Sequence, residues 1–135
     1  MPTAEEATFV RTVEQLAVEI GNYPIDAFWF VQNGLQHTAH KVHGAPSRDG
    51  VRRNRHVSGQ DLAVGLKEFA QDQWGRMART VLAGWNIRST YDFGQIVFAM
   101  IRAGLLQKQP QDSIEDFRDV FEFREAFEDY RIALK

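Results

Sequence analysis

The 135-residue chain contains no cysteine. This absence excludes disulfide bonds, zinc sites with thiolate ligands, iron–sulfur clusters and catalysis by a thiol group. No stretch of the sequence approaches the roughly 20 apolar residues that a membrane-spanning helix needs. Residues 1–6 are polar and acidic, with no apolar run behind them, which does not fit a signal peptide. We therefore expect a cytoplasmic protein with no membrane association.

A strong charge of one sign is also missing. The net charge is −2 and the isoelectric point is near 6.1, whereas dedicated nucleic-acid-binding domains often exceed about 9. The charge is nevertheless uneven, because cations dominate residues 41–56 and carboxylates dominate residues 112–129. What the sequence does contain is a globular composition, with 44% hydrophobic residues and ten phenylalanines. This composition predicts one domain with one hydrophobic core.

Apolar residues at helical spacing predict a mainly α, compact multi-helix domain. Start and stop signals bound helices over 3–20, 24–43, 58–74, 78–85 and 89–103. Ser58 and Ser89 read as helix caps, and glycines 21, 44, 75 and 104 read as helix stops. We divide the single domain into an N-terminal helix pair (1–43), a basic loop (44–57), and a helix-turn-helix-like part with the C-terminal tail (58–135).

The tail has two interpretations. Residues 105–109 and 120–123 fit two strands around a polar loop, followed by a terminal helix from about Arg124. Alternatively, one long helix runs from a cap at Ser113 through the apolar residues that follow. We favour the short hairpin.

Several motifs carry a resemblance to a known family. They are FVQNGL (30–35), HVSGQDL (56–62), WG (74–75), RSTYDFGQIVF (88–98), AGLL (103–106) and the residues from Asp116 onward. On these residues the chain resembles an uncharacterised bacterial family described as restricted to Verrucomicrobia and Planctomycetes. The resemblance implies a bacterial origin and one compact module, and it supplies no catalytic residues.

The order of the predicted helices 58–74, 78–85 and 89–103 is similar to that of a winged helix-turn-helix. In that arrangement helix 89–103 would be the recognition helix and residues 105–123 the wing. The likeness is a pattern of segment lengths and not a motif, and many small helical domains share it.

The basic loop carries Arg48, Arg52, Arg53 and Arg55. Guanidinium groups bind phosphate oxygens in a bidentate fork, so these arginines are candidates for contacts with an anion, RNA or DNA. The loop lacks a Walker spacing, which argues against a nucleotide cradle. A solvated loop whose charges offset the acidic tail is the simpler interpretation. Because the loop has no apolar period, we also expect it to be the most mobile internal segment.

Histidines form the only metal-like pattern. His37 and His40 are three residues apart on a predicted helix, His43 follows, and His56 could add a ligand across the loop. No His-Glu-x-x-His pattern accompanies them, so we predict no metal and no cofactor. Ser58 lies near His56, but a helix cap explains Ser58 better than a nucleophile does. We therefore expect no enzyme.

Two predicted helices carry candidates for contact with a protein partner. Trp29 and Phe30 cannot share the face of Phe28, because neighbours on a helix lie about 100° apart. Either another helix of this chain or a partner protein covers them.

Helix 89–103 is expected to display Tyr91, Gln95 and Arg102, residue types that are ordinary for a protein interface. Base reading is disfavoured because few cations stand on this helix and the tail is acidic. The sequence therefore favours a non-enzymatic protein-interaction or regulatory module. The alternative is a weak, sequence-independent nucleic-acid binder of winged-helix type.

Overall fold

Helices make up the regular structure. The computed structural model describes residues 3–44 and 56–128. The helices are α1 (Ala4–Ile20), α2 (Ile25–His43), α3 (Gly59–Trp74), α4 (Ala78–Gly84), α5 (Thr90–Arg102) and α6 (Phe123–Glu128), with 3₁₀ turns η1 (Gly75–Met77) and η2 (Ile114–Phe117). No strand is present in these two ranges, so the predicted mainly α-helical fold is confirmed. None of the helices described is long and apolar enough to cross a membrane.

Local signals set most helix ends where the sequence places them. At the start of α3 the Asp61 N–H donates to Ser58 Oγ at 3.1 Å. At the start of α5, Ser89 and Asp92 form a capping box. Gly44 ends α2 with a φ of 80°, a conformation that glycine adopts without a steric penalty.

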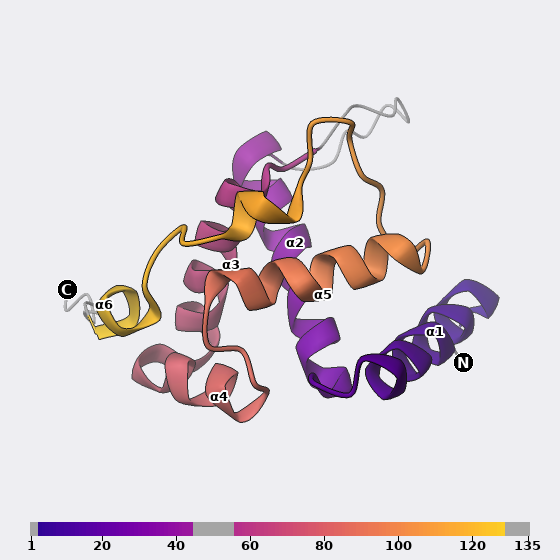
Figure 1. Cartoon of the computed structure of the whole chain (residues 1–135), viewed down its shortest axis with the longest axis horizontal. Coiled ribbons are helices and arrows are strands. Elements are labelled where there is room, and N and C mark those ends of the chain that lie inside the picture. Colours follow the sequence, from indigo (N-terminus) through magenta and orange to yellow (C-terminus); the bar gives the residue numbers. More distant parts are fainter. Residues whose placement is uncertain (1–2, 45–55, 129–135) are drawn as a thin grey trace.

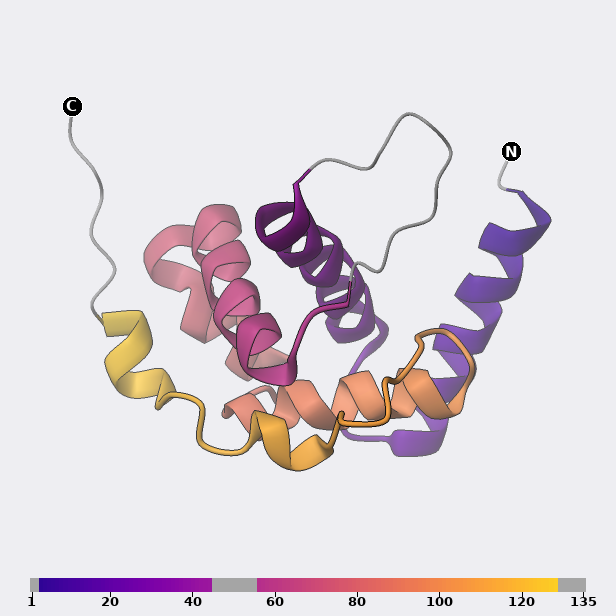
Figure 2. The same cartoon turned by 90° about the horizontal axis from the view of Figure 1, so that it is seen from above.

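Three helices form the centre of the molecule. α2 packs along α3, and α5 runs across both of them (Figure 1). α1 packs on α2 and α5, whereas α6 packs on α3 and α4, so the first and last helices lie at opposite ends (Figures 1 and 2).

Glycines bring α2 and α3 together. A Cβ atom added at Gly65 of α3 would lie 2.7 Å from Thr38 Cγ2 of α2 and nearer still to its hydroxyl oxygen. Gly34 of α2 faces the side chain of Leu66 of α3 in the same way. Residues without a side chain therefore let the two helices approach closely along their length.

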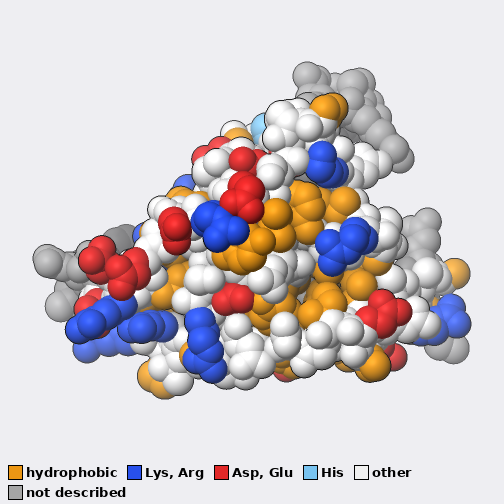
Figure 3. Space-filling view, viewed as in Figure 1, with side chains coloured by type: hydrophobic (Ala, Val, Ile, Leu, Met, Phe, Trp, Pro, Cys, Tyr) orange, Lys and Arg blue, Asp and Glu red, His pale blue; other side chains and the backbone are white. Residues whose placement is uncertain are grey.

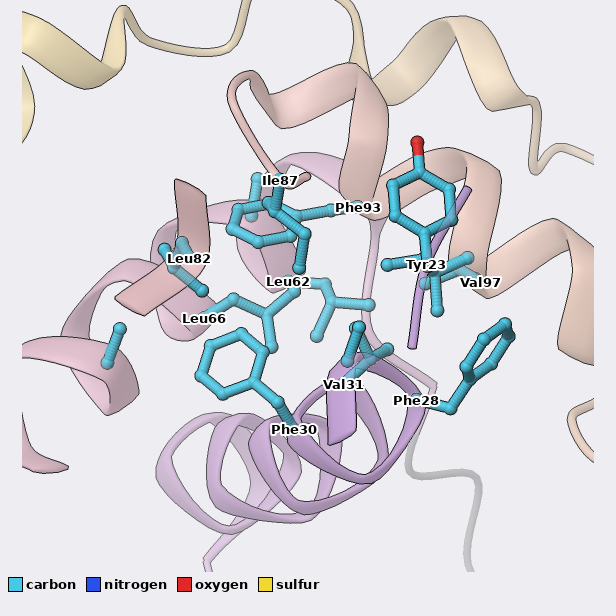
Figure 4. Packing of buried hydrophobic residues seen from close by; sticks show 14 of the residues in the cluster. Tyr23, Phe28, Phe30, Val31, Leu62, Leu66, Leu82, Ile87, Phe93 and Val97 are labelled. Atoms are coloured by element: carbon cyan, nitrogen blue, oxygen red, sulfur yellow. The ribbon is translucent and has the colours of Figure 1, made fainter. Parts of the chain in front are cut away.

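The core fills the space where these helices meet. Figure 4 shows Val31 of α2, Leu62 and Leu66 of α3 and Phe93 of α5 converging on it, and all four are almost fully buried. Phe30 also points into this core (Figure 4). Ring contacts with centroid distances of 5.6–6.3 Å link Phe30 to the rings of Phe69, Trp74, Trp85 and Phe93.

Residues 103–122, which we name the connecting segment, differ from both interpretations of the tail. They form no hairpin and no long helix, but an irregular path interrupted only by η2 (Figure 2). The predicted two-stranded wing is therefore wrong. The predicted terminal helix from Arg124 is confirmed, with its start one residue earlier at Phe123.

Side chains take the hydrogen bonds that a second strand would have taken. Thr90 Oγ1 donates to the Phe117 carbonyl at 2.5 Å and accepts from the Val120 N–H at 3.2 Å. The Asp112 carboxylate accepts from the Gln109 N–H at 2.9 Å. These bonds hold the connecting segment against α5 and in a local turn, in place of a two-stranded ladder.

Candidate functional site

An apolar pocket lies between α2, α3, α5 and the connecting segment. Its volume is about 400 Å³, within the roughly 300–1,000 Å³ of most ligand pockets. The apolar side chains that line it include Leu35, Ala39, Leu62, Phe98, Ile101 and Phe117. The polar side chains are Gln36, His56, Gln107, Gln109, Asp112 and Ser113. We call this cavity the apolar pocket.

One wall of the pocket is not a helix. Leu35 and Ala39 of α2 face the pocket together with Val97, Phe98 and Ile101 of α5. The connecting segment closes this side of the pocket with Leu106, Gln107, Gln109, Asp112, Ser113 and Phe117. Figure 3 shows hydrophobic side chains gathered over α5 and the connecting segment, with Lys and Arg side chains scattered around them.

A histidine and a carboxylate form the polar edge of the pocket. His56 Nε2 lies 3.0 Å from Asp112 Oδ1, and both side chains are mostly buried. The His56 carbonyl oxygen lies 2.7 Å from Nε2 of His43 on α2. This contact joins the end of α2 to the start of α3, so the pocket edge is held from three sides.

The sequence did not predict this pair. His56 was considered as a metal ligand or as a base beside Ser58, but its polar partner is Asp112, 56 residues away. Ser58 caps α3, as expected. Within residues 3–44 and 56–128 no group of three or more His, Asp or Glu side chains is arranged to hold a metal ion. A contact between residues so far apart leaves no spacing pattern by which sequence reasoning could find it.

Some of the predicted contact residues of α5 already contact other residues of this chain. The Arg118 guanidinium lies over the Tyr91 ring, 4.6 Å from its centroid. Arg118 also donates to Glu115 at 2.6 Å, and this hydrogen bond lowers the pKa of the Glu115 carboxyl group. Arg102 is exposed, as predicted.

Gln95 belongs to a part-buried network with Tyr23 and Asp92. The Tyr23 hydroxyl donates to Asp92 Oδ1 at 2.5 Å and lies 2.9 Å from the side-chain oxygen of Gln95. Burial, followed by the hydrogen bond to Asp92, raises the pKa of Tyr23 well above its ordinary value. The network fixes the start of α2 to α5, so Gln95 has a structural role.

The structure corrects part of the prediction for Trp29 and Phe30. Phe30 is only 4% exposed, so it cannot contact a partner. Trp29 is half-buried, and its ring packs on Phe9 of α1 at 4.9 Å in an edge-to-face arrangement. Other helices of the same chain cover this face of α2, which is the simpler of the two explanations we considered.

The candidate anion-contact residues of the basic loop fall in the part of the chain that is not described. Arg48, Arg52, Arg53 and Arg55 lie outside the described residues. Their contact with phosphate, and the expected mobility of the loop, stay predictions.

The lining of the pocket offers a ligand apolar walls and neutral hydrogen-bonding groups. Its walls are apolar, and the two titratable side chains that line it are paired with each other. The Ser113 hydroxyl accepts from the Glu115 N–H at 3.2 Å, as the cap of η2. The remaining polar lining consists of neutral amide side chains, which orient a ligand by hydrogen bonds without transferring a proton.

Comparisons of the chain with protein-family models, with curated proteins and with solved structures gave no match. The resemblance to the uncharacterised bacterial family therefore stays a prediction.

Proposed function

We propose that this protein is a non-enzymatic interaction module of the cytoplasm, and that its apolar pocket receives an apolar side chain of a partner protein. The observation that carries the proposal is the 400 Å³ pocket, walled by α2, α3 and α5. Binding energy at protein interfaces concentrates in a few anchors that enter such pockets. Rigid helices on three sides also give the pocket a preformed shape, which limits the entropy lost on binding.

The order of α3, α4 and α5 supports an interaction role on a helix-turn-helix-like frame. In this proposal α5, at the place of a recognition helix, contributes Phe98 and Ile101 to the pocket and Arg102 to its surroundings. Reading DNA bases would need polar side chains that project freely. Two candidates do not project in this way, because Tyr91 contacts Arg118 and Gln95 contacts Tyr23.

The test is a selection of binders from a phage-displayed library of random peptides. We expect peptides that share an aromatic or aliphatic anchor. Ala39→Trp should fill the pocket from α2 and weaken their binding by at least about tenfold. The matched control is Val64→Trp on α3, where residue 64 is 40% exposed and outside the pocket.

A second pocket variant tests whether a loss of binding comes from the pocket rather than from misfolding. Leu106→Glu places a charge at the wall that the connecting segment forms, and it should also abolish binding. Circular dichroism should show that the helices of this variant are intact. Selected peptides that bind both variants as well as the native protein would contradict the proposal. Binding to duplex DNA or RNA that falls steeply with salt, with no peptide selected, would favour the nucleic-acid alternative.

A further inference from the structure

We infer that α1 is a hinged flap, which opens as one unit about Gly21 while the other helices stay folded. α1 lies at one end of the molecule, against α2 and α5 (Figure 2). Its opening uncovers the parts of these two helices on which it packs, including the Trp29 ring. The flap is separate from the proposed function, because none of the described residues of α1 lines the apolar pocket.

The apolar contact of α1 with the rest of the molecule is small. Among its described side chains Val13 and Leu16 are buried, whereas Phe9, Ala17 and Ile20 are only partly covered. Each of α2, α3 and α5 buries six or more residues. The free energy of burial is roughly proportional to the apolar area removed from water. Detaching α1 therefore costs less than detaching any of the three central helices.

Polar interactions do not join α1 to its neighbours within residues 3–44 and 56–128. The hydroxyl groups of Thr8 and Thr12 donate at 2.9 Å to carbonyls one turn earlier in the same helix. The described charged side chains, Arg11, Glu14 and Glu19, form no ion pair within these two ranges. Because apolar contacts have no preferred direction, α1 can leave and return without breaking a specific bond.

Hydrogen bonds to other elements begin directly after α1. The Asn22 carbonyl accepts from Asn86 Nδ2 at 2.7 Å, and the Tyr23 hydroxyl donates to Asp92 Oδ1 at 2.5 Å. Between α1 and these bonds lies Gly21, which is exposed and has a φ of 73°, a conformation that glycine adopts without a steric penalty. An opening that starts in α1 therefore meets its first tertiary hydrogen bond at Asn22.

This juxtaposition of a helix without tertiary hydrogen bonds, a glycine and a bonded segment defines a unit of local opening. Regions with little buried apolar surface open at a lower free energy than the core does. α1 has 17 residues, and a helix of this length in a protein draws most of its stability from packing. Once detached, α1 therefore loses its helical hydrogen bonds and exposes its amide groups to water.

Hydrogen exchange of the full chain, measured by mass spectrometry of its peptides, tests the flap. We expect the amides of α1 to be at least about a hundredfold less protected than those of α2, α3 and α5, with the change at residues 21–23. Equal protection in α1 and α2 would overturn the inference. Low protection that continued through α2 would overturn it as well, because the hinge would then not lie at Gly21.

A matched pair of variants shows whether α1 opens separately. Leu82 is fully buried on α4, at the opposite side of the molecule from α1 (Figure 1). Leu82→Ala should speed exchange in α2, α3 and α5 by at least about thirtyfold but leave α1 unchanged, because the closed and opened forms lose the same packing. Val13→Ala destabilises the closed form relative to every opened form, so it should speed exchange in all four helices by about tenfold.

The change at Leu82 is the decisive one. Leu82→Val is the milder variant if Leu82→Ala does not fold. An equal rise of exchange in α1 and α3 on either change would show that α1 opens only when the whole protein unfolds, and would overturn the inference. Peptide binding at the apolar pocket does not enter this measurement, so the proposed function and the flap can fail independently.

Discussion

Two of the elements that pack on α3, α2 and η2, use glycine in the same way but are held by different interactions. At the α2–α3 contact, Gly65 lies against Thr38. At the η2 contact, Gly59 of α3 and Gly94 of α5 lie against Phe117. In both places the missing side chain of a glycine makes room for a buried residue of the partner element.

The difference lies in what else stabilises each contact. α2 and α3 are long helices whose backbones satisfy their own hydrogen bonds, so many side chains share the packing. η2 is a single turn that depends on the Phe117 ring and on the bonds of Thr90. A contact built on so few groups opens at a lower free energy than one spread along two helices. Because Phe117 also lines the apolar pocket, the weaker contact is the one beside the site.

The largest expected effect is at η2. Phe117 is 3% exposed, so Phe117→Ala removes a buried ring and should lower the free energy of unfolding by about 3–4 kcal/mol. Chemical denaturation measures this change. A loss below about 1 kcal/mol would show that the turn collapses onto α5 without its ring and would contradict the contrast drawn between the two contacts.

A double-mutant cycle isolates the glycine at this contact. A Cβ at residue 94 would lie 2.8 Å from Phe117 Cβ, so Gly94→Ala should be destabilising in the native background. In the Phe117→Ala background the same change should be neutral or stabilising, since alanine is the better helix former. Equal effects in both backgrounds would place the strain elsewhere.

The next effect is at the α2–α3 contact. Gly65→Ala would force its methyl group against Thr38, which is 2% exposed and cannot move aside, and should destabilise by about 2–3 kcal/mol. Gly84→Ala is the matched control, because a Cβ there meets no atom within 4 Å. That control should be neutral or slightly stabilising in thermal melts. If Gly65→Ala behaved like Gly84→Ala, the close approach of the two helices would be refuted.

Two buried threonines, one at each contact, should give smaller changes in stability that differ between the two contacts. Thr90→Val removes both bonds that fix the connecting segment and should destabilise by about 2 kcal/mol. Thr38→Val removes only a bond to the Gly34 carbonyl within α2 and should have less than half that effect. Hydrogen exchange should become faster at residues 114–120 in the first variant alone. Faster exchange across α2 and α3 as well would mean that the two contacts unfold as one unit.

The same contrast explains what could be predicted from the sequence. Caps such as Ser58 and Ser89 act on their own N-terminal turns, so the starts of α3 and α5 were predictable from neighbouring residues. Ser113 is a cap of the same type, but it starts only η2, because Phe117 and Thr90 end the turn through contacts distant in sequence. A local signal sets where a helix begins, whereas tertiary contacts set how far it continues.

The candidate site was less predictable than the helices. Leu35 belongs to a stripe that the sequence shows, yet the same stripe includes Val42, which is 49% exposed. Periodicity identifies the apolar face of a helix and not the length over which a neighbour covers it. The pocket is such a gap in coverage, and its polar edge joins His56 to the distant Asp112.

The smallest expected effect concerns Tyr23, which fixes the start of α2 to α5. Tyr23→Phe leaves Asp92 and Gln95 without the hydroxyl and should lower the free energy of unfolding by about 1 kcal/mol at neutral pH. The pKa of Tyr23 is raised in the folded state, so its contribution is complete below the unfolded pKa of about 10 and is lost as the pH rises above that value. The native protein should therefore lose stability in alkali faster than the variant, by at most about 1.4 kcal/mol per pH unit. Other tyrosines and lysines titrate in both proteins and cancel in the difference. Denaturant unfolding of both proteins between neutral pH and strong alkali measures this difference in the free energy of unfolding. A difference that stays constant with pH would show that the buried hydroxyl is not what joins α2 to α5.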